Sequence, residues 1–102
     1  MPKYKFKCWE GSCEQLVQTL TETLAKMFEG TVGTFYVYPS RLLKNAGIHW
    51  MCKDVAKRVL DLLYQNGVIK YSEELKMFYG TARDASMVRV FKDVITKQIC
   101  AT

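Results

Sequence analysis

Residues 38–80 constrain the fold more than any other part of this sequence, because they hold two helical patterns in close succession. Pro39 suits the first turn of a short helix, where its missing N–H has no partner to lose, and Gly47 suits the position just after the end of that helix. A longer helix is predicted over residues 49–65, because apolar residues recur there at the three- and four-residue spacing of one helical face.

The same stretch ends in a predicted β-hairpin. Asn66 and Gly67 end the longer helix and turn the chain. Residues 68–71 and 75–79 are rich in β-branched, aliphatic and aromatic side chains and predict two strands on either side of a polar turn. The predicted order is therefore helix, turn, helix and hairpin.

This layout resembles the winged-helix family, most specifically in the segment LLYQNGVIKY at residues 62–71. Members of the family often close their recognition helix with two apolar residues, a polar pair, a glycine, two aliphatic residues and a basic residue. The resemblance covers a little under half of the chain and implies an α+β winged helix-turn-helix fold. It also implies nucleic-acid binding, with the recognition helix 49–65 in the major groove and the wing 68–80 on the backbone.

The segments before this stretch fit the same layout. Ser12 and Gln15 predict a capping box at the start of a helix that runs to about Glu29. Residues 31–38 predict a strand, which in winged-helix domains commonly pairs with the hairpin to give a three-stranded sheet. Residues 3–9 alternate basic and apolar side chains, which predicts either an edge strand or a basic arm near a phosphate backbone.

A last helix is predicted within residues 84–102, after an N-terminal arm (1–11) and a core (12–83) that form a single domain with it. This helix has two apolar faces, more than a small domain needs to cover. The surplus predicts that the helix forms a homodimer, and the alternative is that it packs back over the first helix. The predicted dimerisation residues are Val88, Phe91, Val94, Ile95 and Ile99.

The net charge of +5 and the pI near 9.1 favour a polyanionic partner. The apolar fraction of 49% is that of an ordinary globular protein. The sequence contains no run of about eighteen apolar residues, so no membrane span is predicted. No apolar run follows the N-terminal lysines, so no secretory signal is predicted. We therefore expect an intracellular, cytoplasmic protein, in the host cytoplasm if the chain is viral.

A basic face is predicted on the second helix of the pair. Lys53 and Lys57 are one turn apart and share a face with Trp50, where base and phosphate contacts fall in this fold. Trp50 has an alternative role as a core aromatic between the two helices, and Asp54 and Asp61 interrupt the basic face. The predicted DNA-binding residues are Arg41, Lys44, His49, Trp50, Lys53, Lys57, Arg58, Lys70 and Lys76.

The four cysteines are Cys8, Cys13, Cys52 and Cys100, and they leave three alternatives open: buried thiols, disulfides or metal ligands. A Cys8–Cys13 disulfide would tie the N-terminal arm to the first helix. Cys100 would pair with its own copy in a symmetric dimer or remain a free thiol. Zinc held by Cys8, Cys13, His49 and Cys52 is a further alternative, although the spacings are not those of a usual zinc finger.

The sequence shows few of the residue arrangements that enzymes use for catalysis. His49 is its only histidine, and no recognisable motif positions a serine or cysteine as a nucleophile. Glu73 and Glu74 lie at the predicted hairpin tip, where exposure does not favour a raised pKa. We expect a protein that is not an enzyme and has no cofactor or metal.

Together these patterns predict a sequence-specific double-stranded-DNA-binding protein that acts as a transcriptional regulator. The chain resembles small archaeal and archaeal-virus regulators of the winged-helix class in size and cysteine content. One alternative is an RNA- or ribosome-binding protein, because residues 38–47 and the NGVIKY segment are also similar to a small-subunit ribosomal protein of winged-helix fold. Another is a winged-helix module that binds a protein.

Overall fold

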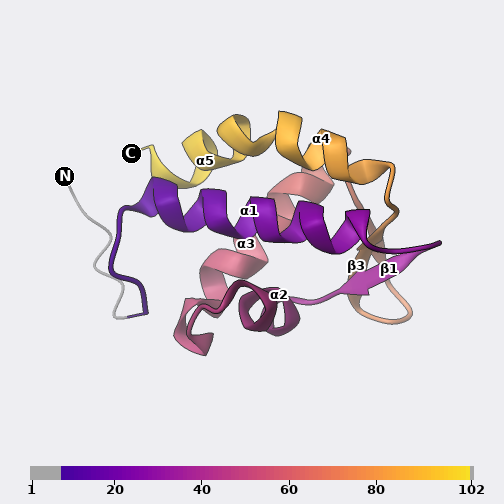
Figure 1. Ribbon diagram of the computed structural model, residues 1–102, viewed down its shortest axis with the longest axis horizontal. Coiled ribbons are helices and arrows are strands. Elements are labelled where there is room, and N and C mark those ends of the chain that lie inside the picture. The colour runs from indigo at the N-terminus through magenta and orange to yellow at the C-terminus, as the bar shows by residue number, and fades with distance from the viewer. Residues whose placement is uncertain (1–7, 102) are drawn as a thin grey trace.

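The longest helix, α1 (Cys13–Glu29), runs along the length of the molecule and carries the centre of its core (Figure 1). The computed structural model describes residues 8–101. Ser12 Oγ accepts a hydrogen bond from the Gln15 N–H, and the Gln15 side chain accepts one from the Ser12 N–H, both at 3.1 Å. The predicted capping box is confirmed. The fully buried residues along this helix include Leu16, Leu20, Leu24 and Phe28.

The two predicted central helices are present as α2 (Pro39–Ala46) and α3 (Lys53–Gln65). Gly47 adopts the left-handed conformation that its position predicted, with φ of 70°. The predicted second helix begins with a short 3₁₀ turn, η1 (Trp50–Cys52), which leads directly into α3. The helix pair therefore lies where the periodicity predicted it, with a tighter first turn.

A three-stranded antiparallel sheet covers the end of α1 and makes the domain α+β. Its strands are β1 (Phe35–Val37), β2 (Lys70–Ser72) and β3 (Met77–Gly80), with β3 in the middle. The prediction that the strand before α2 pairs with the hairpin is confirmed, although β1 is shorter than predicted. Of the strand predicted over residues 3–9, residues 3–7 lie outside the described residues.

The C-terminal region forms two helices where one was predicted: α4 (Asp84–Val90) and α5 (Lys92–Cys100). Phe91 separates them, but backbone hydrogen bonds continue through it. Its N–H donates to the Met87 carbonyl at 3.0 Å, and its carbonyl accepts from the Ile95 N–H at 2.9 Å. The interruption is therefore a local distortion, and both helices lie along α1 (Figure 1).

This packing settles which face of the C-terminal helices is covered. Val88, Ile95 and Ile99, three of the predicted dimerisation residues, are buried inside the chain, and Phe91 is half-buried against the core. These residues pack on α1 within the same chain, which was the predicted alternative to dimerisation. Val94 is the one member of the predicted set that is exposed. The exposed apolar residues of α4 and α5 are Met87, Val90 and Val94.

Two disulfides join segments far apart in the sequence. Cys8 pairs with Cys52, and Cys13 pairs with Cys100, with Cα atoms 5.5 and 5.8 Å apart. Disulfides were among the predicted alternatives, but the Cys8–Cys13 bridge and the pairing of Cys100 with its own copy are wrong. The zinc alternative is also wrong, because the sulfurs of Cys8, Cys13 and Cys52 are already bonded. The fold explains the pairing: the end of α5 returns to the start of α1, and residue 8 lies against η1.

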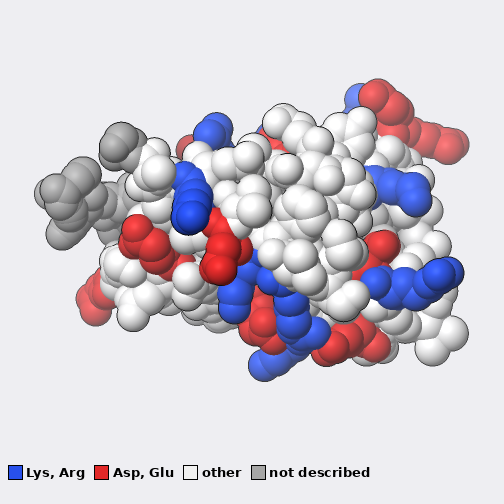
Figure 2. Space-filling view, turned by 90° about the horizontal axis from the view of Figure 1, so that it is seen from above, with Lys and Arg blue, Asp and Glu red and all other residues white. Residues whose placement is uncertain are grey.

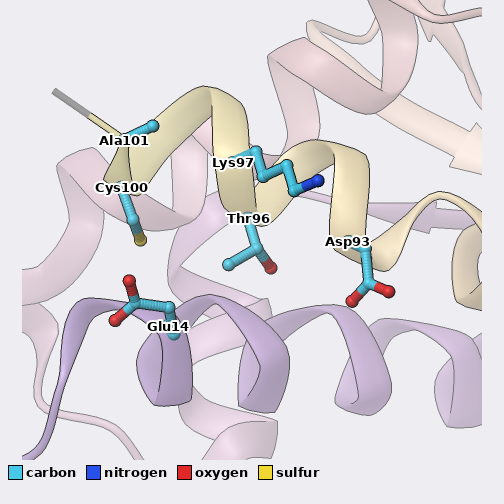
Figure 3. A pocket seen from close by; sticks show the side chains of 6 residues that line it. All are labelled: Glu14, Asp93, Thr96, Lys97, Cys100 and Ala101. Atoms are coloured by element: carbon cyan, nitrogen blue, oxygen red, sulfur yellow. The ribbon is translucent and has the colours of Figure 1, made fainter.

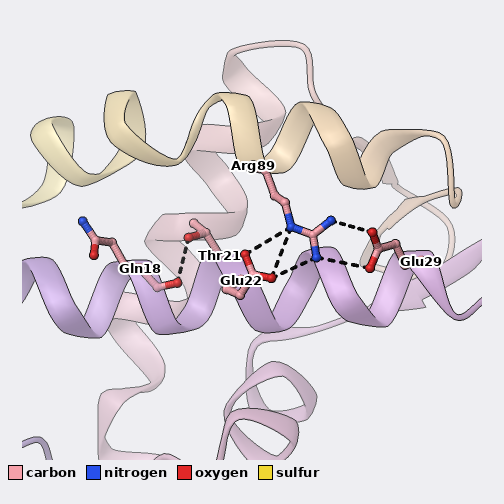
Figure 4. Close-up of polar contacts among 5 residues, drawn as sticks. All are labelled: Gln18, Thr21, Glu22, Glu29 and Arg89. Atoms are coloured by element: carbon pink, nitrogen blue, oxygen red, sulfur yellow. Dashed lines mark hydrogen bonds and ion pairs between the residues drawn. The ribbon is translucent and has the colours of Figure 1, made fainter.

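Arg89 on α4 forms a polar link to α1 (Figure 4). Its Nη2 lies 2.9 Å from Glu22 Oε2, and its Nη1 lies 2.6 Å from Glu29 Oε2. These hydrogen bonds lower the pKa of both carboxyl groups and raise the pKa of the guanidinium. The acidic side chains of α1 are therefore partly neutralised within the chain.

Candidate nucleic-acid interface

The exposed side of α3 carries the basic residues that the sequence predicted there. The apolar positions of α3 are buried against the core, which turns the polar positions outward. Lys53, Lys57 and Arg58 are all exposed. A helix that presents several cations to solvent, on a face not needed for packing, has the charge that phosphate contacts require.

Trp50 lies at the start of this face with 69% of its surface exposed, so its alternative role as a core aromatic is wrong. The His49 and Trp50 ring centroids are 5.5 Å apart. His49 Nδ1 accepts a hydrogen bond from the Met51 N–H at 3.1 Å and so caps η1. With Nδ1 accepting, a neutral His49 carries its proton on Nε2, which remains a donor for an external acceptor.

Two aspartates interrupt the basic face, as the sequence indicated. Lys57 Nζ lies 2.9 Å from Asp61 Oδ2, and Asp54 is exposed in the first turn of α3. An exposed pair at this i,i+4 spacing contributes about 0–1 kcal/mol, because water screens it and holding two long side chains costs entropy. A phosphate is therefore able to compete with Asp61 for Lys57.

The two basic residues of α2 have structural surroundings of their own. The Arg41 guanidinium carbon lies 5.4 Å from the centroid of the Phe35 ring, a cation–π distance that connects α2 to β1. Lys44 is in the last turn of α2, where a positive charge interacts favourably with the helix dipole. Both side chains are exposed, so these contacts do not remove them from a ligand.

The hairpin lysines lie at the opposite end of α3 from Trp50. Tyr64, near the end of α3, has its ring 6.2 Å from that of Tyr71, so the hairpin packs beside this end of the helix. Lys70 and Lys76 are exposed, and Lys76 adopts a positive φ of 57° in the turn. α3 is about 20 Å long at 1.5 Å per residue, so Lys53 at its start and the hairpin lysines beside its end belong to two separate basic regions.

A hollow of about 330 Å³ lies between the start of α1 and the end of α5 (Figure 3). Its charged groups are the Glu14 and Asp93 carboxylates and the Lys97 amine. The Cys100 sulfur beside it is bonded to Cys13 and is not a nucleophile. Of the residues predicted for function, this hollow includes Cys100 alone, so it lies apart from the candidate interface. Its lining residues are Glu14, Asp93, Thr96, Lys97, Cys100 and Ala101.

The sequence predicted a binding role for Lys70 but not for the two tyrosines that lie beside it on the sheet. Tyr36, Tyr79 and Lys70 lie side by side across the three strands, on the face of the sheet that points away from the core. Alternation along each short strand was the available signal. It was insufficient, because which residues become neighbours depends on strand register, and register is set by pairing between distant segments.

No protein-family model, curated protein or solved structure matches this chain. Within residues 8–101, no helix has the length and apolar character needed to cross a membrane. The same residues contain no group of three or more histidine, cysteine or acidic side chains arranged to hold a metal ion.

Proposed function

We propose that this chain is a winged-helix protein that binds double-stranded DNA in a sequence-specific way and regulates transcription without catalysis. The order α2, η1 and α3, then hairpin, with a small antiparallel sheet, supports the winged-helix class. The observation that carries the proposal is the exposed basic side of α3, with Lys53, Lys57 and Arg58 in solvent and Trp50 exposed just before the helix begins.

In this proposal the basic region on α3 and the basic region on the hairpin contact different parts of the duplex. The α3 cations neutralise phosphates along the major groove, which releases counterions and makes affinity depend steeply on salt. Trp50, at the helix start, reaches a sugar or a thymine methyl, and His49 Nε2 donates to an acceptor beside it. Lys70 and Lys76 contact the flanking backbone as the wing does in this class.

A homodimer is part of the same proposal. The exposed apolar side chains of α4 and α5 supply its surface, with Val90 exposed over 67% of its area. Seen from the side of these helices, a broad uncharged area occupies the middle of the molecule, with charged side chains around it (Figure 2). A two-fold pairing through this face gives two copies of α3, as binding to a palindromic site requires.

The proposal is tested by measuring affinity for random-sequence duplex DNA over a series of salt concentrations. The wild type is compared with Lys53→Ala/Lys57→Ala. We expect the slope of log K against log salt to fall in magnitude by about 1.8 in the double variant, because each phosphate contact contributes about 0.9. Light scattering on the same samples gives the molar mass and therefore tests the homodimer.

Lys26→Ala/Lys97→Ala is the matched control, because it removes the same charge from exposed positions on α1 and α5. A control slope that falls as much as that of the α3 variant means that net charge alone binds DNA and contradicts the interface on α3. Absence of duplex binding by the wild type at low salt contradicts the DNA proposal altogether. The same chain is then tested with structured RNA and for protein partners.

A further inference from the structure

The outer face of the sheet has an ordered row of side chains. Strand register places Tyr36 of β1 opposite Tyr79 of β3, and Tyr79 opposite Lys70 of β2. Side chains of directly paired residues share a face of the sheet, so these three point the same way. The neighbouring row on this face is Met77 and Ser72. The opposite face carries Val37 and Phe78, which are buried in the core.

The two tyrosines of this row form a solvent-accessible aromatic surface. Their ring centroids are 5.2 Å apart and their planes are tilted by 38°. Tyr36 is 37% exposed, and Tyr79 is half-buried beside it. A directly opposite aromatic pair stabilises a sheet on either face, and on this outer face it also leaves ring surface accessible to a ligand. Here the rings contact each other and solvent.

The charge on this face suits an anion. Lys70 is exposed, and within residues 8–101 it takes part in no ion pair. The outward positions of the three strands are Tyr36, Lys70, Ser72, Met77 and Tyr79, and none of them is acidic. The row therefore combines two flat aromatic rings with one free cation at its end.

This combination matches a nucleic acid whose bases are unpaired. Exposed aromatic rings stack on the faces of bases, and a lysine beside them neutralises the phosphate that connects the bases. In a duplex the base faces are covered by neighbouring base pairs, so a ring on a sheet surface has no access to them. The row is thus suited to a strand with open bases, whereas the α3 cations are suited to a duplex.

We propose that the outer face of the sheet is a second binding site, which takes single-stranded nucleic acid by stacking two adjacent bases on Tyr36 and Tyr79, with Lys70 on the intervening phosphate. The site uses different residues from α3 and goes beyond duplex binding. The two proposals are independent, because single-strand binding at the sheet and duplex binding at α3 can each occur without the other. Lys70 also belongs to the wing in the duplex proposal, so this lysine would contact a duplex phosphate or the single strand, whereas Tyr36 and Tyr79 would serve the single strand alone.

The test is the affinity for labelled oligothymidylate, with oligouridylate in parallel to distinguish DNA from RNA. Tyr36→Leu and Tyr79→Leu are each expected to weaken binding about 5-fold to 150-fold, because stacking contributes about 1–3 kcal/mol per base. Tyr36→Phe retains the ring and is expected to bind within about 2-fold of wild type, since stacking does not need the hydroxyl. Lys70→Gln is expected to reduce the salt slope by about 0.7, the value for one contact on a single strand.

Tyr64→Leu is the matched control, because Tyr64 is exposed to a similar degree but lies on α3, beside the inner face of the sheet. It is expected to leave single-strand binding unchanged. An equal loss in Tyr64→Leu and Tyr36→Leu would overturn the site, and so would a wild type that binds neither oligonucleotide at low salt.

A measurement on the wild type covers the case in which a leucine variant fails to fold. Ultraviolet cross-linking of the bound oligonucleotide, followed by mass spectrometry of the peptides, identifies the residue in contact with the bases. Cross-links at Tyr36 or Tyr79 support the site. Cross-links confined to Trp50 and α3 overturn it and assign single-strand binding to the duplex interface.

Discussion

The two ends of this molecule are held together by different means. At one end, the Cys8–Cys52 and Cys13–Cys100 disulfides join residue 8, η1, the start of α1 and the end of α5, segments that can be followed in Figure 1. We call this the bridged end. At the other end, the sheet end, aromatic rings pack edge to face: Phe28 and Phe35 have centroids 6.1 Å apart, and Tyr71 and Phe78 have centroids 4.8 Å apart.

The difference shows two ways in which a small chain stabilises the ends of its fold. The sheet end has a hydrogen-bonded register that brings large rings together, so it is stabilised by burial and packing. The bridged end joins helix ends and an irregular segment, and two covalent bonds connect these parts. Disulfides stabilise such a region chiefly by restricting the unfolded chain, and their effect grows slowly with the length of the loop that they close.

The largest effect is expected from removing the disulfide with the longer loop. Cys13→Ala/Cys100→Ala opens a bridge between residues 87 apart in sequence, and chain entropy predicts a loss of about 4–5 kcal/mol in unfolding free energy. Cys8→Ala/Cys52→Ala, with a separation of 44, is expected to lose about 4 kcal/mol. Urea unfolding measures both losses.

Hydrogen exchange on the same variants sharpens the comparison. Amides at the bridged end are expected to lose the most protection, while those at the sheet end lose no more than the fall in global unfolding free energy, because aromatic packing there does not depend on the disulfides. A loss below about 1 kcal/mol in both double variants would mean that the two ends do not differ in this way.

A smaller effect is expected at the sheet end from Gly80→Ala. A Cβ atom at Gly80 would lie 2.9 Å from Phe28 Cζ and 3.0 Å from Asp84 Oδ2. Phe28 is fully buried and has no room to move, so overpacking is expected to cost about 1–3 kcal/mol in urea unfolding. Gly30→Ala is the control, since its Cβ would meet only the Lys26 carbonyl at 3.6 Å. A loss in Gly30→Ala as large as that in Gly80→Ala would refute the steric cause.

The smallest effect is expected at the exposed link between α1 and α4. Arg89→Gln removes the hydrogen bonds that lower the pKa of Glu22 and Glu29 below the ordinary value of 4.5. A lowered carboxyl pKa stabilises the folded state above about pH 4.5, and this contribution is lost as the pH falls through the folded pKa values. The wild type should therefore melt a few degrees above Arg89→Gln at neutral pH, and the difference should vanish in acid.

Circular dichroism melts over a pH series measure this difference. Arg83→Gln removes an exposed arginine that, within residues 8–101, forms no ion pair, and it serves as the control. A difference between wild type and Arg89→Gln that persists unchanged into acid would show that Arg89 acts through packing alone.

Local patterns in the sequence predicted most of the elements correctly. The Ser12 capping box, the α2 end at Gly47 and the turn at Gly67 each depend on a few neighbouring residues, and all three are present. The exposed basic side of α3 followed from the apolar periodicity of the same helix. Its binding to DNA remains a prediction, as do the winged-helix class and the cytoplasmic location.

Two features that the sequence did not predict depend on residues far apart in the chain. Four cysteines allow three complete pairings, and the correct one depends on where the end of α5 and residue 8 return to α1 and η1. The row of Tyr36, Tyr79 and Lys70 depends on the register of three strands from distant segments. Neither feature has a local signature.

The sequence by itself determined the order of helices and strands and the polar side of each helix, because backbone propensity and side-chain periodicity act over a few residues. Only the tertiary structure decided which of the two apolar faces of the C-terminal helices is covered. Val88 and Ile95 are buried on α1 while Val90 is left exposed, and both faces carry apolar residues in the sequence. The choice depends on how separate helices pack into one core, and that is a property of the whole chain.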